Sequence, residues 1–220
     1  MFNILTAFII NFNRKMGISE RKDREKAEMR KLILDAAMEI FIKEGYNGIS
    51  IRKIAEKIEY SPGSIYTYFP DKDSIFYALH VEGFESLYKK QVSSQSINDP
   101  RERLLAHGKA YIEFAMENQE YYDLMFILRE PMDFICKEES LDWTHGTRSF
   151  DLLVRNVAEC QAVGFFKNHD TVSVAFLFWS IVHGMVSILI RRGSAIKKVH
   201  DLDTQRIIED TLGLLREIIK

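Results

Sequence analysis

Small and hydroxyl-bearing side chains gather in the segment Ile49–Ile75, which reads ISIRKIAEKIEYSPGSIYTYFPDKDSI. Ser64 and Thr67 lie three residues apart, so on a helix they share a face and can reach base edges or phosphates. Gly63 leaves room for a close approach of the backbone, and Ser61 stands where the helix would begin. These types and spacings predict a short helix that enters the major groove of DNA.

Other side chains around this helix have the chemistry to contact the DNA backbone. Tyr66 and Tyr68 can donate their hydroxyls to phosphate oxygens. Ser50 and Arg52 open the preceding helix, where free N–H groups and the helix dipole favour an anion, and Lys72 opens the following one. Each residue alone fits a plainer interpretation, with the tyrosines as core aromatics and the lysine as a solvated charge. Their order along the chain favours DNA contact for the set.

The residues before this segment predict a longer helix over Arg21–Glu44. Its apolar positions are spaced by three and four residues and form one face: Met29, Ile33, Ala36, Ala37, Ile40 and Phe41. Gly45 is the natural stop, as a residue with left-handed (αL) backbone at the helix end. The stripe of the next helix consists of Ile51, Ile54, Ala55 and Ile58.

Capping residues define the short helices. Ser50 and Ser61 are N-cap candidates, and Pro62 occupies a first helical position, where its missing N–H costs nothing. Pro70 ends the short helix, with Ile65 and Phe69 facing inward. Asp71 caps a fourth helix, which runs through Ile75, Leu79 and Phe84 toward Lys90.

From about Lys31 to Phe76 the sequence resembles the TetR-type transcriptional repressors. The matching positions are Phe41, Glu44–Tyr46, Ser50, Ile54–Ala55, Ser61, Gly63, Ile65–Tyr66, Tyr68–Phe69 and Lys72. The resemblance implies phosphate contacts for Ser50, Ser64, Tyr66, Tyr68 and Lys72. It implies an approach to base edges for Arg52, Pro62, Gly63 and Thr67.

Glu59 departs from the family pattern, because the turn between the two short helices usually carries glycine. A non-glycine residue with αL backbone costs roughly 1 kcal/mol, and a carboxylate near phosphates is unfavourable. We therefore expect either a shifted turn or a Glu59 side chain that points to solvent, and we expect Glu59→Gly to stabilise this region.

The composition of the chain limits its fold class and the functions it can have. The chain has 220 residues, 46% of them hydrophobic, with 4 Pro and 11 Gly, which favours helices and provides an ample core. A net charge of −2 excludes little, since DNA binding depends on local basic surface. Cys136 and Cys160 form no disulfide framework or metal motif, which is typical of a reducing cytoplasm. No common nucleotide-binding or hydrolase motif is present, and we expect neither enzymatic activity nor a cofactor or metal.

The N-terminal stretch Met1–Lys15 has an apolar run of roughly 12 residues, too short for a bilayer span, and its charges follow that run rather than precede it. We interpret it as an upstream extension or a locally packed tail, with Met16 as the alternative start. The expected organisation is an extension over residues 1–20, a helix-turn-helix DNA-binding domain over 21–76, and an effector-binding and dimerisation domain over 77–220.

The second region also reads as helical, so the chain is predicted to be all-α, with a helical bundle following the three-helix DNA-binding domain. A polar linker is expected over Ser93–Asp99 and helices over Pro100–Glu117, Tyr121–Leu128, Leu141–Val163 and Asp203–Ile219. Thr171–Ile190 is apolar enough to invite a membrane interpretation, but interspersed serines and His183 favour a helix buried on several sides.

Phe178–Ile190 resembles the "WHG" type of TetR C-terminal domain at Trp179, His183 and Gly184, and Tyr111–Phe126 is also similar to that group. Aromatic and Met side chains in a helical bundle can enclose a small hydrophobic or amphipathic effector, although each is as easily core. The candidates are Phe114, Met125, Phe126, Trp143, Phe150, Phe178, Trp179 and His183.

We expect the last two long helices, Thr171–Arg191 and Asp203–Ile219, to mediate dimerisation. They would form a four-helix interface with the same two helices of a second copy. The resulting hypothesis is a cytoplasmic homodimer that represses from operator DNA and is released by an effector acting through the helix Phe76–Lys90. A DNA-binding dimer without an effector is the alternative, and a helical-bundle metal enzyme is a remote one.

Overall fold

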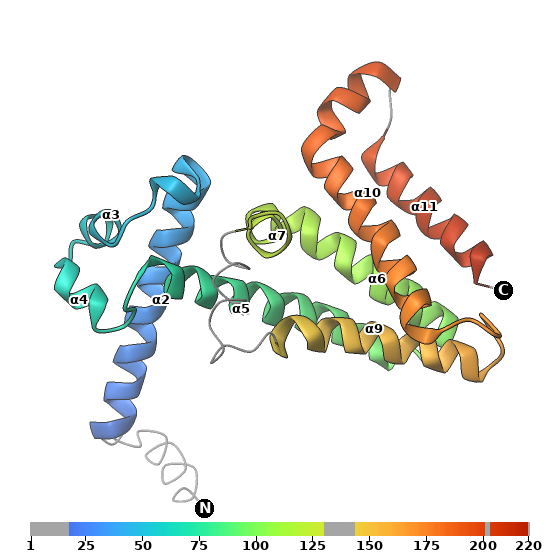
Figure 1. Cartoon of the computed structure of the whole chain (residues 1–220), viewed down its shortest axis with the longest axis horizontal. Helices are drawn as coiled ribbons and strands as arrows, with labels where there is room; N and C mark the ends of the chain where they lie inside the picture. The colour runs from blue at the N-terminus through green and yellow to red at the C-terminus, as the bar shows by residue number, and fades with distance from the viewer. Residues whose placement is uncertain (1–17, 130–143, 201–202, 220) are drawn as a thin grey trace, which may run out of the picture. The chain divides into compact units, whose positions relative to one another are not determined.

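The structure is a computed structural model that describes residues 18–129, 144–200 and 203–219 (Figure 1). Met1, Met16, Cys136 and Trp143 lie outside the described residues. The described residues form helices joined by turns and short irregular segments and contain no strand, so the all-α prediction is confirmed. The chain divides into two compact units, Met1–Ile75 and Phe76–Lys220.

The first unit begins with α2 (Ile18–Glu44), followed by the 3-10 turn η1 (Tyr46–Gly48) and the short helices α3 (Ile51–Lys57) and α4 (Pro62–Tyr66). Its core joins one face of each helix: Ile33, Ala36, Ala37, Ile40, Ile51, Ile54, Ala55, Ile65 and Phe69 are all buried. The predicted stripes of α2 and α3 therefore supply the core, and Ile65 and Phe69 face inward as expected.

Gly45 behaves differently from the prediction. It has φ 71° and ψ −179°, so its φ is positive but its ψ is extended rather than αL. This region of backbone space is essentially restricted to glycine. Its N–H still donates to the carbonyl of Phe41 at 2.8 Å, which closes the last turn of α2.

The second unit contains most of α5 (Lys72–Val92), then η2 (Ser93–Ser96), α6 (Pro100–Glu117), α7 (Gln119–Phe126), α9 (Thr144–Ala162), α10 (Thr171–His200) and α11 (Thr204–Ile218). Helix α6 is central and packs against α7, α9, α10 and α11 (Figure 1). Local signals set its ends, because Asp99 accepts a hydrogen bond from the N–H of Glu102 at 2.9 Å and Pro100 takes the first position.

Two predictions for this unit change by more than a few residues. The polar stretch Ser93–Asp99 is not a plain linker, because its first four residues form η2 and Ser94 is buried. Helix α10 continues to His200, beyond the expected end near Arg191. Cys160 is a free, buried thiol whose pKa burial raises to about 11.

Among the described residues, one stretch, Thr171–Gly193 in α10, is long and apolar enough by length and composition to cross a membrane. Of the residues in its most apolar window, 28% are buried within the chain. The expectation that this helix is buried on several sides therefore holds only in part for a single copy. Several apolar side chains of this helix, among them Val172, Phe176, Leu177 and Ile188, are exposed in a single copy of the chain.

Candidate DNA-binding surface and effector cavity

Helix α4 has the geometry of a short recognition helix. Ser61 caps it, since its Oγ accepts a hydrogen bond from the N–H of Ser64 at 3.2 Å and lies 2.9 Å from the Ser64 Oγ. The Thr67 hydroxyl donates to the Gly63 carbonyl at 3.3 Å. These bonds fix the hydroxyl-bearing side chains of α4 in place, while Pro62 removes one donor from its first turn.

The two faces of α4 differ as a reading helix requires. Ile65 is fully buried, whereas Tyr66 is 56% exposed. Ser61, Pro62, Gly63 and Thr67 are exposed, and Ser64 and Tyr68 are half-buried. Tyr66 is thus not a core aromatic. Ser50 and Arg52 are exposed at the start of α3, where Ser50 accepts from the Lys53 N–H at 3.2 Å.

Lys72 is held at the first turn of α5. Its ammonium lies 3.8 Å from the centre of the Tyr46 ring, close enough for a cation–π interaction. The Tyr46 hydroxyl donates to Asp73 Oδ1 at 2.6 Å, and Asp71 Oδ1 accepts from the Ser74 N–H at 2.7 Å. Lys72 therefore extends from a helix end that these contacts hold in place.

Arg30 is a residue that the sequence analysis missed. Its guanidinium lies 4.3 Å above the Phe69 ring and donates to the Tyr68 carbonyl at 3.1 Å, so it ties α2 to the end of the recognition helix. The signal was present, because Arg30 lies three residues before buried Ile33 and so near the apolar face of α2.

The turn between α3 and α4 is the expected one and is not shifted. Glu59 has φ 59°, in the αL region, and its side chain is exposed. Its N–H donates to the Glu56 carbonyl at 3.2 Å, and the Tyr60 N–H donates to the Ala55 carbonyl at 2.9 Å. This pair of bonds defines a Schellman motif with glutamate where glycine is usual.

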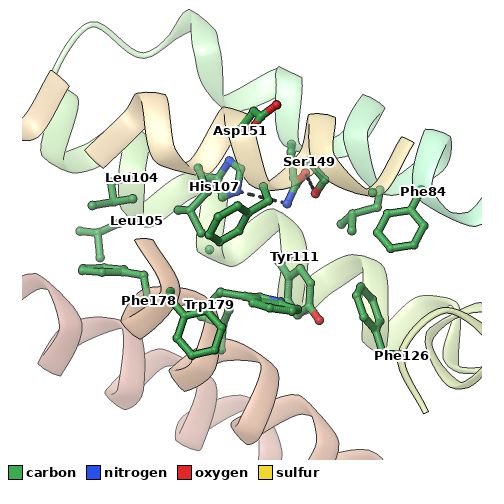
Figure 2. Close-up of a pocket in the computed structure, with 18 of the residues that line it drawn as sticks. Phe84, Leu104, Leu105, His107, Tyr111, Phe126, Ser149, Asp151, Phe178 and Trp179 are labelled. Atoms are coloured by element: carbon green, nitrogen blue, oxygen red, sulfur yellow. Dashed lines mark hydrogen bonds between the residues drawn. The ribbon is translucent and has the colours of Figure 1, made fainter. Parts of the chain in front are cut away.

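The second unit contains a cavity of about 270 Å³ that is bordered by α5, α6, α7, α9, α10 and α11 (Figure 2). Most of its wall is aromatic or aliphatic: Phe84, Leu87, Leu104, Leu105, Tyr111, Phe126, Phe150, Leu153, Phe176, Phe178, Trp179, Val182, Leu212 and Leu215. Its lining is predominantly hydrophobic and aromatic, as is common in pockets that bind small apolar molecules.

Four of the eight residues predicted for an effector, Phe126, Phe150, Phe178 and Trp179, line this cavity. Phe114 and Met125 are buried in the core and do not border it, and Trp143 is outside the described residues. His183 does not border the cavity, and its Nδ1 lies within hydrogen-bond distance, 2.8 Å, of the Tyr111 hydroxyl. Burial lowers the pKa of His183 and raises that of Tyr111, so both are neutral near pH 7.

A buried polar cluster forms one end of the cavity and was not predicted. It joins Gln91 of α5, His107 of α6, and Ser149 and Asn156 of α9. As the atoms lie, the Ser149 hydroxyl donates to Gln91 Oε1 at 2.7 Å, and Gln91 Nε2 lies 3.1 Å from His107 Nε2. Asn156 Nδ2 lies 3.3 Å from His107 Nδ1. Burial lowers the pKa of His107 to about 4, so its ring is neutral.

Comparison with known proteins agrees with this architecture of a helix-turn-helix unit and a helical bundle, which together define a class of DNA-binding transcriptional regulators. Residues 33–79 match the model described as "Bacterial regulatory proteins, tetR family". Residues 104–215 match the "Tetracyclin repressor-like, C-terminal domain". The chain belongs to the TetR family of transcriptional regulators. Members of this family bind operator DNA and act as dimers.

Individual relatives cover the chain only in part. The "Uncharacterized HTH-type transcriptional regulator YobS" of Bacillus subtilis is 33% identical over 94 residues, 43% of this chain and 49% of that protein. HbdR of Aromatoleum sp. is 28% identical over 71% of this chain and 68% of its own length. The chain thus spans about half of YobS, and 37% of YuxN, another Bacillus subtilis regulator.

Solved structures show the same fold at low sequence identity. A Rhodococcus sp. RHA1 protein of unknown function superposes with a TM-score of 0.69 at 22% identity, covering 86% of this chain and 94% of that one. The fatty acid degradation regulator FadR of Bacillus halodurans gives 0.67 at 20% identity, covering 84% and 93%. At these identities the likeness concerns the fold alone.

Proposed function

We propose that this protein is a homodimeric repressor that leaves its operator when a small apolar molecule fills the cavity of the second unit. The observation that carries the proposal is the cavity itself, about 270 Å³ with an almost wholly apolar wall. An apolar cavity of this size would cost packing energy without a ligand, so its size and lining favour a role in ligand binding.

The DNA contacts are proposed for the exposed surface of α3, α4 and the start of α5. Ser50, Ser64, Tyr66, Tyr68 and Lys72 would contact phosphates, and Arg52, Pro62, Gly63 and Thr67 would approach base edges. Ser61 would support α4 as its cap. The support comes from their fixed, outward placement on one short helix and its neighbours.

The dimer surface is proposed on α10 and α11. Apolar side chains that are more than half exposed recur on both helices: Val172, Phe176, Leu177, Ile188, Leu214 and Ile218. A second copy would cover them and would bury the part of α10 that this chain leaves open. Two bound recognition helices would then lie roughly 34–36 Å apart, one turn of DNA.

Helix α5 is the proposed connection between effector and DNA. It carries Lys72 at its first residue and contributes Phe84, Leu87 and Gln91 to the cavity wall. A ligand that prefers one position of α5 over another shifts the population of the DNA-binding state by its difference in affinity for the two.

The test begins with operator selection from random DNA by the purified full chain, followed by titration of the selected complex with a panel of neutral apolar compounds. Operator binding that weakens as a compound saturates supports the proposal, and a panel that binds without releasing DNA refutes the repressor-release mechanism. Lys72→Gln should lower operator affinity and reduce the salt slope by about 1.8, because each bound dimer loses two phosphate contacts. Lys89→Gln is the control, since it makes the same charge change on exposed α5 surface outside the proposed contacts.

A pair of variants at Gly108 tests the cavity directly. Gly108 lines it, and a Cβ there would meet only Val182 Cγ1, at an ordinary 3.5 Å. Gly108→Leu should fill the space and abolish compound-driven release while operator binding persists. Gly108→Ala is the matched control and should keep release, because it occupies little of the volume.

A further inference from the structure

The buried polar cluster at the end of the cavity has a hydrogen-bonding conflict as its atoms lie. Amide nitrogens of Gln91 and Asn156 face the two ring nitrogens of His107, at 3.1 Å and 3.3 Å. A neutral imidazole accepts at one nitrogen and donates at the other. Both amides cannot donate to it, so one carboxamide must be turned by 180°, which exchanges its oxygen and nitrogen.

A hydrogen bond to a backbone carbonyl determines which of the two carboxamides must be turned. The Ser94 hydroxyl donates to the backbone carbonyl oxygen of Gln91 at 2.7 Å, and a carbonyl oxygen can only accept. With its proton committed, the Ser94 oxygen must accept from its other neighbour, the Gln95 side chain at 3.2 Å. Gln95 therefore presents its nitrogen there, and the same nitrogen donates to Asn156 Oδ1 at 3.1 Å.

The remaining protons follow in sequence. Since Asn156 Oδ1 accepts, its amide nitrogen donates to His107 Nδ1, and the His107 proton must lie on Nε2. That N–H needs an acceptor at Gln91, so the Gln91 side chain is the one that turns. Its oxygen then faces His107, and its NH₂ group donates to Ser149 Oγ across the 2.7 Å contact.

Ser149 Oγ is then an acceptor on the protein side, and no other hydrogen bond to a described residue uses its proton. Ser149 is buried and lines the cavity, and Figure 2 shows it and His107 above Trp179 and Phe178. We infer that the Ser149 hydroxyl is a fixed hydrogen-bond donor for the ligand, which would be an apolar molecule bearing a neutral acceptor, such as a carbonyl oxygen, at its buried end. This inference rests on the effector role proposed for the cavity.

The groups around Ser149 disfavour a ligand whose buried end carries a charge. Among the residues that the structure describes, a ligand ammonium would meet no carboxylate at Ser149, because the groups beside it are the Gln91 amide and, beyond that, a neutral imidazole. An ionised carboxylate would be desolvated with one neutral hydroxyl as partner, which is costly. Asp151 also borders the cavity but is exposed, so it belongs to the rim rather than to the buried end.

The experiment uses the full chain and three neutral probes. 1-N-phenylnaphthylamine reports occupancy of the apolar cavity by its fluorescence, and butyrophenone and butylbenzene compete with it as a matched ketone and hydrocarbon. Ser149→Ala should weaken butyrophenone by about threefold to tenfold, the range for one neutral hydrogen bond, and leave butylbenzene unchanged. Ser180→Ala, which removes an exposed helical hydroxyl outside the cavity, should change neither.

The outcomes separate the two proposals. If the fluorescent probe does not bind the wild type, the effector cavity itself fails. If it binds but Ser149→Ala affects ketone and hydrocarbon equally, only the donor assignment is overturned. The ring of His107 gives an independent readout, since long-range ¹H–¹⁵N correlations should show the Nε2–H tautomer. The Nδ1–H tautomer would reverse the order of donors and refute the assignment.

Discussion

Replacing Glu59 by glycine should stabilise the protein by roughly 0.8 kcal/mol. Glu59 has φ 59° at the position of the Schellman motif where glycine is usual. The Cβ penalty there is about 1–2 kcal/mol. Glycine also lowers the free energy of unfolding by about 0.4–1 kcal/mol, because it increases the conformational entropy of the unfolded chain. Because both hydrogen bonds of the motif are made by backbone atoms, the substitution leaves them intact.

Urea unfolding followed by circular dichroism measures this difference, with Glu59→Ala and Glu59→Asn as controls. Alanine keeps the Cβ and removes the carboxylate, so it should resemble the wild type. Asparagine tolerates αL and should lie between alanine and glycine. If glycine were no more stable than alanine, backbone strain at Glu59 would not be the cause. Operator affinity should rise equally in the alanine and glycine variants, since both remove the same negative charge.

Three further predictions concern other buried contacts. Burial lowers the pKa of His80 and of His107 to about 4, so between about pH 6.5 and 4 the unfolded chain binds protons that the folded chain does not. The free energy of unfolding should therefore fall as the pH is lowered through this range. Urea titrations of His107→Gln should show a weaker dependence of this free energy on pH. Arg30→Ala should destabilise the protein by about 1–2 kcal/mol, and Arg30→Lys should recover only part of it because lysine lacks the planar stacking group, as thermal unfolding would show. Gly83→Ala should cost about 1–3 kcal/mol, since its Cβ would lie 2.5 Å from Met125 Sδ; an unchanged midpoint in urea would contradict this packing.

The recognition region was predictable because its signals are local. Ser50, Ser61 and Pro62 define helix starts within a few residues of themselves, and the apolar stripes of α2 and α3 need only helical periodicity. Glu59 was recognised as misplaced for the same reason. Gly45 shows the limit of such signals, because a glycine after a helix predicts a positive φ but not the ψ that the following turn imposes.

The cavity was harder to predict, since aromatic residues in a helical bundle look alike from sequence whether they fill a core or line a void. Phe114 and Phe178 are both nearly fully buried, yet only Phe178 borders the cavity. The difference depends on how α6, α9 and α10 meet, and those contacts join residues far apart in the chain. Composition therefore predicts an aromatic interior, and only the packing shows where it is hollow.

The polar cluster shows why the stretch after α5 was misread as a linker. Ser94 and Gln95 are polar and local propensity places them in a loop. Gln95, however, donates to Asn156 of α9, and Asn156 in turn contacts His107 of α6. Burial of this set is tolerable only because each member bonds another. Once satisfied, the cluster fixes the end of α5 through Gln91 while it sets the direction of the Ser149 proton. A ligand that accepts this proton would therefore act on the same hydrogen-bonded group that anchors α5, which gives the proposed effector a physical route to the helix that carries Lys72.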